Sequence, residues 1–105
     1  MQIEIALDSE TLKAFNSAKC GETFLTSLGR VMGAVFEQVP NHQREGIQDL
    51  TSTASGHWSP PNRVKLYGET AETLQKCATA LDCSDDEAFS RGVRSIPADP
   101  PVFSG

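Results

Sequence analysis

The stretch from residue 63 to residue 96, RVKLYGETAETLQKCATALDCSDDEAFSRGVRSI, decides how the rest of the chain is organised. Its first five residues alternate polar and apolar, which is the pattern of a strand with one buried face. Two apolar series with helical spacing follow, separated by Asp82 and Cys83. Ser84 is a good N-cap for the second series, and Pro97 ends it. The stretch therefore predicts strand, helix, turn and helix.

Residues 2–39 predict the same order of elements. Residues 2–7 alternate strictly, and Asp8 or Ser9 can cap a short helix that ends near Gly21. A second amphipathic helix follows from Phe24 until Pro40 terminates it. The first helix begins with the letters SETL at 9–12, and its counterpart contains AETL at 71–74. The shared order and polarity of elements indicate an internal repeat.

Residues 40–62 connect the two halves and are rich in Ser, Thr, Gly and Pro. Such a segment is long for a connection inside a compact domain and suggests a linker or a functional loop. We expect one helical turn near residues 45–52 and packing of Trp58 over the core. The sequence predicts one α+β, mostly helical domain over residues 1–96, followed by an extended tail at 97–105.

A strand and two helices of this length cannot bury a core alone, because the strand edge and the apolar helix faces need partners. The pattern resembles half of a ribbon-helix-helix DNA-binding domain, and residues 1–39 and 63–96 would supply both halves in tandem within one chain. The resemblance implies that the two strands pair antiparallel and that the helices interlock about a pseudo-twofold axis. It also implies that outward strand side chains enter the major groove of DNA.

The resemblance implies a small DNA-binding accessory or regulatory protein of the kind found in bacterial, plasmid or phage transcription regulation or in DNA transfer. On the outward ribbon face, Arg63 and Lys65 suit guanine, Gln2 suits adenine and Glu4 could accept from cytosine. Tyr67 lies on the same face. A solvated ribbon face without DNA contacts explains the same residues equally well.

The resemblance also implies phosphate contacts by backbone amides at the start of each second helix, at Glu22-Thr23 and at Ser84-Asp85. Glu22 and the three carboxylates at 85–87 would oppose a phosphate there. This departure from the expected chemistry weakens the DNA hypothesis most, and it points towards a protein partner. Lys76, Arg91 and Arg94 could touch a phosphate, although pairing of Arg91 with Glu87 one turn earlier is the favoured interpretation.

The formal net charge of −5 argues against nucleic-acid binding, for which a basic surface is expected. The alternative hypothesis is therefore a protein-binding module on the same scaffold, of the antitoxin, anti-repressor or inhibitor type. It would act through its acidic surface and the 40–62 loop.

The remaining patterns exclude several classes of function. Three cysteines without a CxxC pair, no signal peptide and no membrane span predict a cytoplasmic protein with free thiols, in which Cys77 is a core residue. His42 and His57 lack a nearby Cys pair, so no zinc site is expected. No catalytic constellation or cofactor motif is identifiable, so we expect no enzyme.

Gly29 and Gly33 lie four residues apart on the predicted second helix, which favours close crossing of another helix there. The predicted core combines apolar residues of both halves: Ile3, Ile5, Leu12, Phe15, Phe24, Leu25, Leu28, Val31, Met32, Val35, Val64, Leu66, Leu74, Leu81, Phe89 and Val93.

Overall fold

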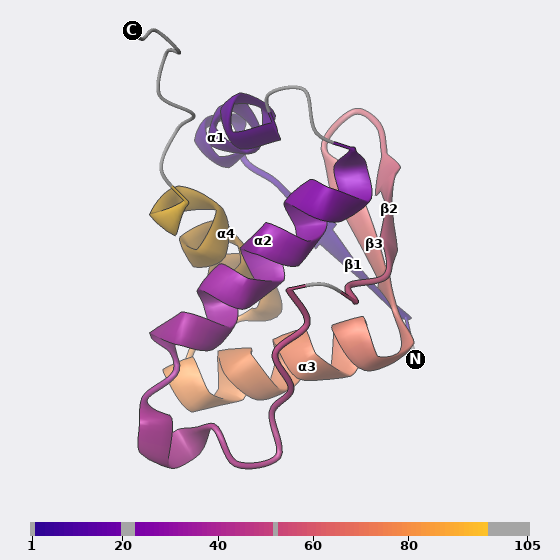
Figure 1. Cartoon of the computed structure of the whole chain (residues 1–105). Helices are drawn as coiled ribbons and strands as arrows, with labels where there is room; N and C mark the ends of the chain where they lie inside the picture. Colours follow the sequence, from indigo (N-terminus) through magenta and orange to yellow (C-terminus); the bar gives the residue numbers. More distant parts are fainter. Residues whose placement is uncertain (1, 20–22, 52, 97–105) are drawn as a thin grey trace, which may run out of the picture.

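The computed structural model describes residues 2–19, 23–51 and 53–96 and shows four α-helices, a 3₁₀ turn and three strands in that part of the chain (Figure 1). In chain order they are β1 (Gln2–Ala6), α1 (Ser9–Lys19), α2 (Phe24–Gln38), η1 (Asn41–Gln43), β2 (Gly56–Ser59), β3 (Arg63–Tyr67), α3 (Gly68–Leu81) and α4 (Asp85–Ser95). The α+β, mostly helical class predicted from the sequence is confirmed.

The sheet is antiparallel, with the strand order β1-β3-β2. Ile3 lies opposite Leu66 and Ile5 lies opposite Val64, so the two strands expected from the sequence pair with each other. The third strand, β2, pairs with the other edge of β3 and places Trp58 opposite Val64. The sequence did not predict β2, and the ribbon is therefore three strands wide rather than two.

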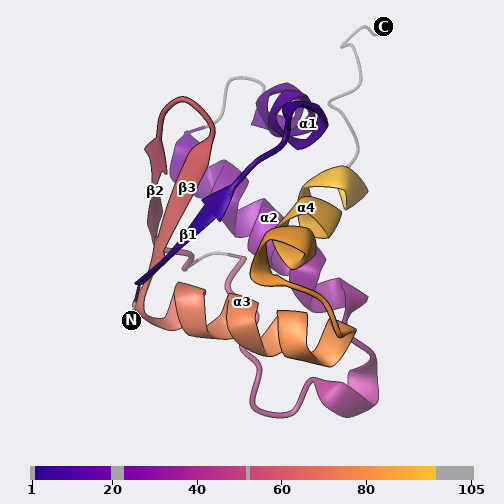
Figure 2. The same ribbon diagram turned by 180° about the vertical axis from the view of Figure 1, so that it is seen from behind.

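The helices lie together on one side of the sheet, as the two opposite views in Figures 1 and 2 show. Apolar side chains from the inner sheet face meet those of the helices in one core. Phe15 and Phe89 are its largest buried side chains. Burial of these alternating strand residues fixes the register, since a slip of one residue would turn them to solvent. The other face of the sheet carries the remaining strand side chains.

Three glycines allow close approaches in the fold, one between two helices and two between a helix and the connecting segment. A Cβ at Gly92 on α4 would collide with Val35 and the carbonyl oxygen of Val31 on α2, so Gly92 allows these helices to cross closely. A Cβ at Gly29 would collide with the Thr51 carbonyl oxygen, and one at Gly33 with the Thr51 hydroxyl. The predicted helix crossing at Gly29 and Gly33 is wrong, because the connecting segment crosses there.

Two further predictions are also corrected. Leu25 is 53% exposed, because Phe24 takes the inward position of that turn and packs against Phe15 and Trp58. No helical turn forms at the described residues of 45–52; the short 3₁₀ turn lies earlier, at Asn41–Gln43. Trp58 packs against the core as expected, but it does so from a strand.

Candidate nucleic-acid interface

The face of the sheet that points away from the helices is built by simple alternation along the strands. Inward neighbours such as Ile5, Val64 and Leu66 are completely buried, so the residues between them point outward. We call this surface the outer face. It consists of Gln2, Glu4 and Ala6 on β1, Arg63, Lys65 and Tyr67 on β3, and His57 and Ser59 on β2.

The strand order makes β3 the central row of the outer face. Lys65 lies between Glu4 of β1 and His57 of β2. Arg63 lies between Ala6 and Ser59, while Tyr67 lies opposite Gln2. Five of the six DNA-contacting residues predicted from the sequence, all except Ser84, therefore share one surface.

One ion pair crosses the outer face diagonally. The Arg63 Nη1 donates to Glu4 Oε1 at 2.8 Å, and the two side chains are 55% and 38% exposed. An exposed pair of this kind contributes about 0–1 kcal/mol, so it can open when a stronger acceptor approaches. Among the described residues, no ion pair engages Lys65. The strands thus carry two cations against one carboxylate in a chain whose net charge is −5.

An aromatic contact joins the edge strand β2 to the central strand. The rings of His57 and Tyr67 are 6.4 Å apart and perpendicular. His57 is exposed and Tyr67 is half-buried. The contact packs the imidazole against the end of the central row, and the exposed ring of His57 can still offer an N–H to a ligand.

In each half, a capping side chain accepts a hydrogen bond from a backbone amide at the start of the second helix, α2 or α4. The Ser84 Oγ accepts from the Glu87 amide at 3.1 Å, and the Thr23 Oγ1 accepts from the Thr26 amide at 3.2 Å. Asp85 and Asp86 flank the first of these caps. Ser84 belongs to the turn before α4 and lies on no strand, while Glu22 lies outside the described residues.

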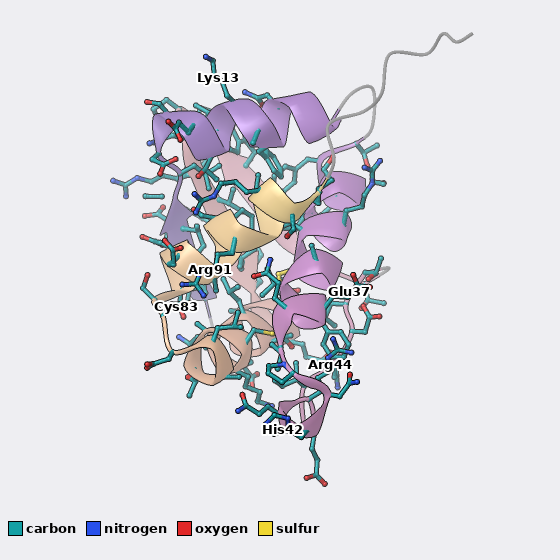
Figure 3. All side chains as sticks on the ribbon, turned by 90° about the vertical axis from the view of Figure 1, so that its left-hand side faces the viewer. Lys13, Glu37, His42, Arg44, Cys83 and Arg91 are labelled. Atoms are coloured by element: carbon teal, nitrogen blue, oxygen red, sulfur yellow. The ribbon has the colours of Figure 1, made fainter. Side chains whose placement is uncertain are left out.

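The cations of the helices are placed differently from those of the outer face. Arg91 pairs with Glu87 at 3.0 Å, as predicted, and Arg94 lies 3.6 Å from the same carboxylate. Figure 3 shows Arg91 on the side of the molecule opposite the sheet. Lys76 donates to the carbonyl oxygen of Gly46 at 3.1 Å. These cations therefore do not extend the outer face.

An open groove of about 920 Å³ separates α3 from the segment after α2. Glu45 stands on the segment side and Glu72 on the helix side, with Lys76 reaching across to Gly46. The groove combines charges of both signs. It is a second surface at which a ligand could be held.

His57 and Ser59 are outer-face residues that the sequence analysis did not predict. Their signal was present: residues 56–59 alternate, and Pro60, Pro61 and Asn62 form a turn before the next strand. The many Ser, Thr and Gly residues around this short strand obscured the alternation. Asn62 then fixes the turn beside β1, because its side-chain amide donates to the Leu7 carbonyl oxygen at 2.8 Å.

The cysteines and carboxylates of the described residues show no comparable centre. Cys77 is completely buried in the core, as predicted, and this burial raises the pKa of its thiol to about 11. Cys83 is half-buried and Cys20 lies outside the described residues. Within the described ranges, no group of three or more His, Cys, Asp or Glu is arranged to hold a metal ion.

Comparison of the chain with protein-family models found no match, and comparisons with curated proteins and with solved structures found none. In the part of the chain that the structure describes, no helix is long and apolar enough to span a membrane.

Proposed function

We propose that this protein binds double-stranded DNA through the outer face of its sheet, as a tandem ribbon-helix-helix domain in one chain. The observation that carries the proposal is the antiparallel pairing of β1 with β3, which puts Arg63 and Lys65 in the middle of an exposed polar sheet face. A β-ribbon of this kind can enter the major groove and present side chains to base edges.

The arrangement of the helices supports the tandem interpretation. The two second helices, α2 and α4, cross closely at Gly92. The first helix of the first half also reaches the second half, because the Thr11 hydroxyl on α1 donates to Ser90 on α4 at 3.3 Å. Interlocked halves of this kind are what a pseudo-twofold arrangement requires.

Each side chain has a defined role in this proposal. Arg63 and Lys65 donate to guanine or phosphate oxygens, and Gln2 contacts adenine. Approach of DNA replaces the exposed Arg63–Glu4 pair with a contact from Arg63 to the nucleic acid. Tyr67 packs at the end of the central row. Ser84 would serve only as a flanking phosphate contact, and its neighbouring carboxylates weaken that role.

Fluorescence anisotropy with random-sequence duplex DNA across a salt series tests the proposal. The wild type should bind at low salt, and log K should fall linearly with log salt because phosphate contacts release counterions. The double variant Arg63→Ala/Lys65→Ala should reduce the salt slope by about 2, on the order of one unit per lost phosphate contact. Retained binding with an unchanged slope would overturn the proposal.

The matched control is Lys13→Ala/Lys76→Ala, which removes the same net charge from the helices. Figure 3 shows Lys13 at the α1 end of the molecule, pointing away from the body. This control should bind nearly as the wild type does, because neither lysine lies on the outer face. Equal loss in both double variants would mean that net charge, rather than the sheet, governs binding.

A protein-binding module remains the second candidate, and the groove between α3 and the segment at 42–47 favours it. Its walls carry Glu45 and Glu72, which suit a partner with basic side chains. Absence of DNA binding at low salt would move the proposal to this surface. Capture of a partner that is lost on Glu45→Gln/Glu72→Gln substitution would then support it.

A further inference from the structure

The third strand gives the outer face two unequal sides. β3 is paired at both edges, β1 forms one margin of the sheet and β2 forms the other. Neighbouring strands lie about 4.8 Å apart, so the axes of β1 and β2 are separated by about 10 Å. The major groove of B-DNA is about 12 Å wide. If the outer face enters the groove, its two margins therefore come to lie against the two groove walls.

The margins carry opposite chemistry toward a phosphate wall. On β2, His57 offers an imidazole N–H and Ser59 offers a hydroxyl, and both groups can donate to phosphate oxygens. On β1, the corresponding position opposite Lys65 is held by the Glu4 carboxylate. A carboxylate repels phosphate and cannot donate to it. At the level of Lys65 the β2 margin thus carries a donor and the β1 margin a carboxylate, while the amide donor of Gln2 on β1 lies further along, opposite Tyr67.

We infer that β2 anchors the sheet to one sugar-phosphate strand of the duplex, so that a single copy binds a site without twofold symmetry in one orientation. This inference rests on the proposed DNA binding and specifies its geometry. The central row of Arg63, Lys65 and Tyr67 contacts bases, His57 and Ser59 contact one backbone, and β1 faces the other backbone with few contacts.

The asymmetry comes from the connecting segment, which contributes a strand at one edge only. A two-stranded ribbon with equivalent halves would present the same row to both walls and would favour a palindromic site. Here rotation about the axis between β1 and β3 would exchange these two strands and would carry the donor-bearing β2 to the outer side of β1, where the described sheet has no strand. The two orientations on a given site are therefore unequal in energy.

Selection from a random 20-base-pair duplex pool, followed by stoichiometry and phosphate-ethylation interference on the selected duplex, tests this inference. The expected result is a motif without twofold symmetry, one chain per duplex, and interference mainly on one strand. A palindromic motif or two chains per site would overturn one-sided contact while leaving DNA binding intact. Failure to select any duplex, with no binding at low salt, would instead overturn the proposed function itself.

A matched pair of variants tests the role of β2 directly. His57→Ala and His42→Ala each truncate one exposed histidine, the first on the β2 margin and the second on η1, away from the sheet (Figure 1). His57→Ala should weaken binding to the selected duplex by about 2- to 12-fold, the range expected for one lost hydrogen bond, and should remove interference at one phosphate. His57→Gln keeps an N–H donor and should restore most of the affinity. A loss on His42→Ala as large as that on His57→Ala would overturn anchoring by β2.

Discussion

Strands β1 and β3 have similar alternating sequences and pair with each other, yet they occupy different positions in the sheet. β3 is paired at both edges, and its inward residues Val64 and Leu66 are completely buried. β1 is a margin, and of its two inward residues Ile5 is completely buried whereas Ile3 is only partly buried. The difference shows that the connecting segment, by adding β2, makes β3 the central strand and leaves β1 at the edge.

The largest expected effect tests this difference in stability. Leu66→Ala should lower the free energy of unfolding by about 2–5 kcal/mol, because it leaves a cavity in the core. Ile3→Ala, at the position directly opposite in the sheet, should cost clearly less, since part of its side chain already contacts water. Urea denaturation of both variants measures the two values, and equal losses would remove the distinction between the strands.

A second pair of variants compares the two close approaches on α2. Gly92→Ala should lower the free energy of unfolding by about 1–3 kcal/mol, because the new methyl group meets a backbone oxygen of α2 that cannot turn away. Gly33→Ala meets the Thr51 hydroxyl, the end of an exposed side chain. Its cost should be small and partly offset by the higher helix propensity of Ala.

Thermal unfolding of Gly33→Ala and Gly92→Ala under the same conditions measures this difference. A destabilisation of Gly33→Ala as large as that of Gly92→Ala would mean that the segment at Thr51 is as rigid as the packed helices. It would also mean that the connecting segment, rather than the helix pair, sets the spacing of the two halves.

A third prediction concerns the outer face and rests on the proposed DNA binding. Glu4→Gln should tighten binding to random duplex DNA several-fold at low salt and make the salt slope steeper by about 1, because it frees Arg63 and removes one repelling charge. Glu72→Gln on α3 changes the net charge equally but lies away from the sheet. Anisotropy titrations of both variants should therefore differ, and equal gains would contradict a local role of Glu4.

Much of the fold follows from clear local patterns of polar and apolar residues in the sequence. Alternation in residues 2–7 and 63–67 predicted both strands and their inward sides, and helical spacing predicted the helices to within a few residues. These patterns are strong because one face of each strand and helix must be buried and is therefore apolar. Asp8 was one of two predicted caps, and it is the residue that bonds to the Thr11 amide.

The connecting segment was predicted less well, for physical reasons that are visible in its contacts. β2 has four residues, too few for a strong alternating signal, and it exists because β3 offers an edge and Phe15 and Phe24 offer a surface for Trp58. Likewise, Gly29 and Gly33 indicate that a backbone segment can pack closely against α2, but they do not indicate which segment does so. Such tertiary pairings depend on residues distant in sequence, so His57 and Ser59 were missed.

The first helices of the two halves also begin differently, which gives the smallest expected effect. The Thr11 amide donates to Asp8 Oδ1 at 2.7 Å at the start of α1, whereas α3 follows Tyr67 directly without a side-chain cap. Hydrogen bonds from Thr11 hold the pKa of Asp8 below its ordinary value of 3.8. Because the pKa is lowered in the folded state, the ionised cap stabilises the protein fully above that ordinary value. The contribution is lost as the pH falls through the lower folded-state pKa.

Asp8→Asn separates the titration of Asp8 from the titrations of the other carboxyl groups, since Asn also caps helices but does not titrate in this range. Unfolding midpoints measured from pH 6 to pH 2 should fall for both proteins, and the wild type should fall slightly further below about pH 4, where its cap becomes protonated. Parallel curves would mean that the Asp8 charge does not contribute to α1. In that case the side chain at position 8 would stabilise α1 through its hydrogen bond alone, a bond that the start of α3 lacks.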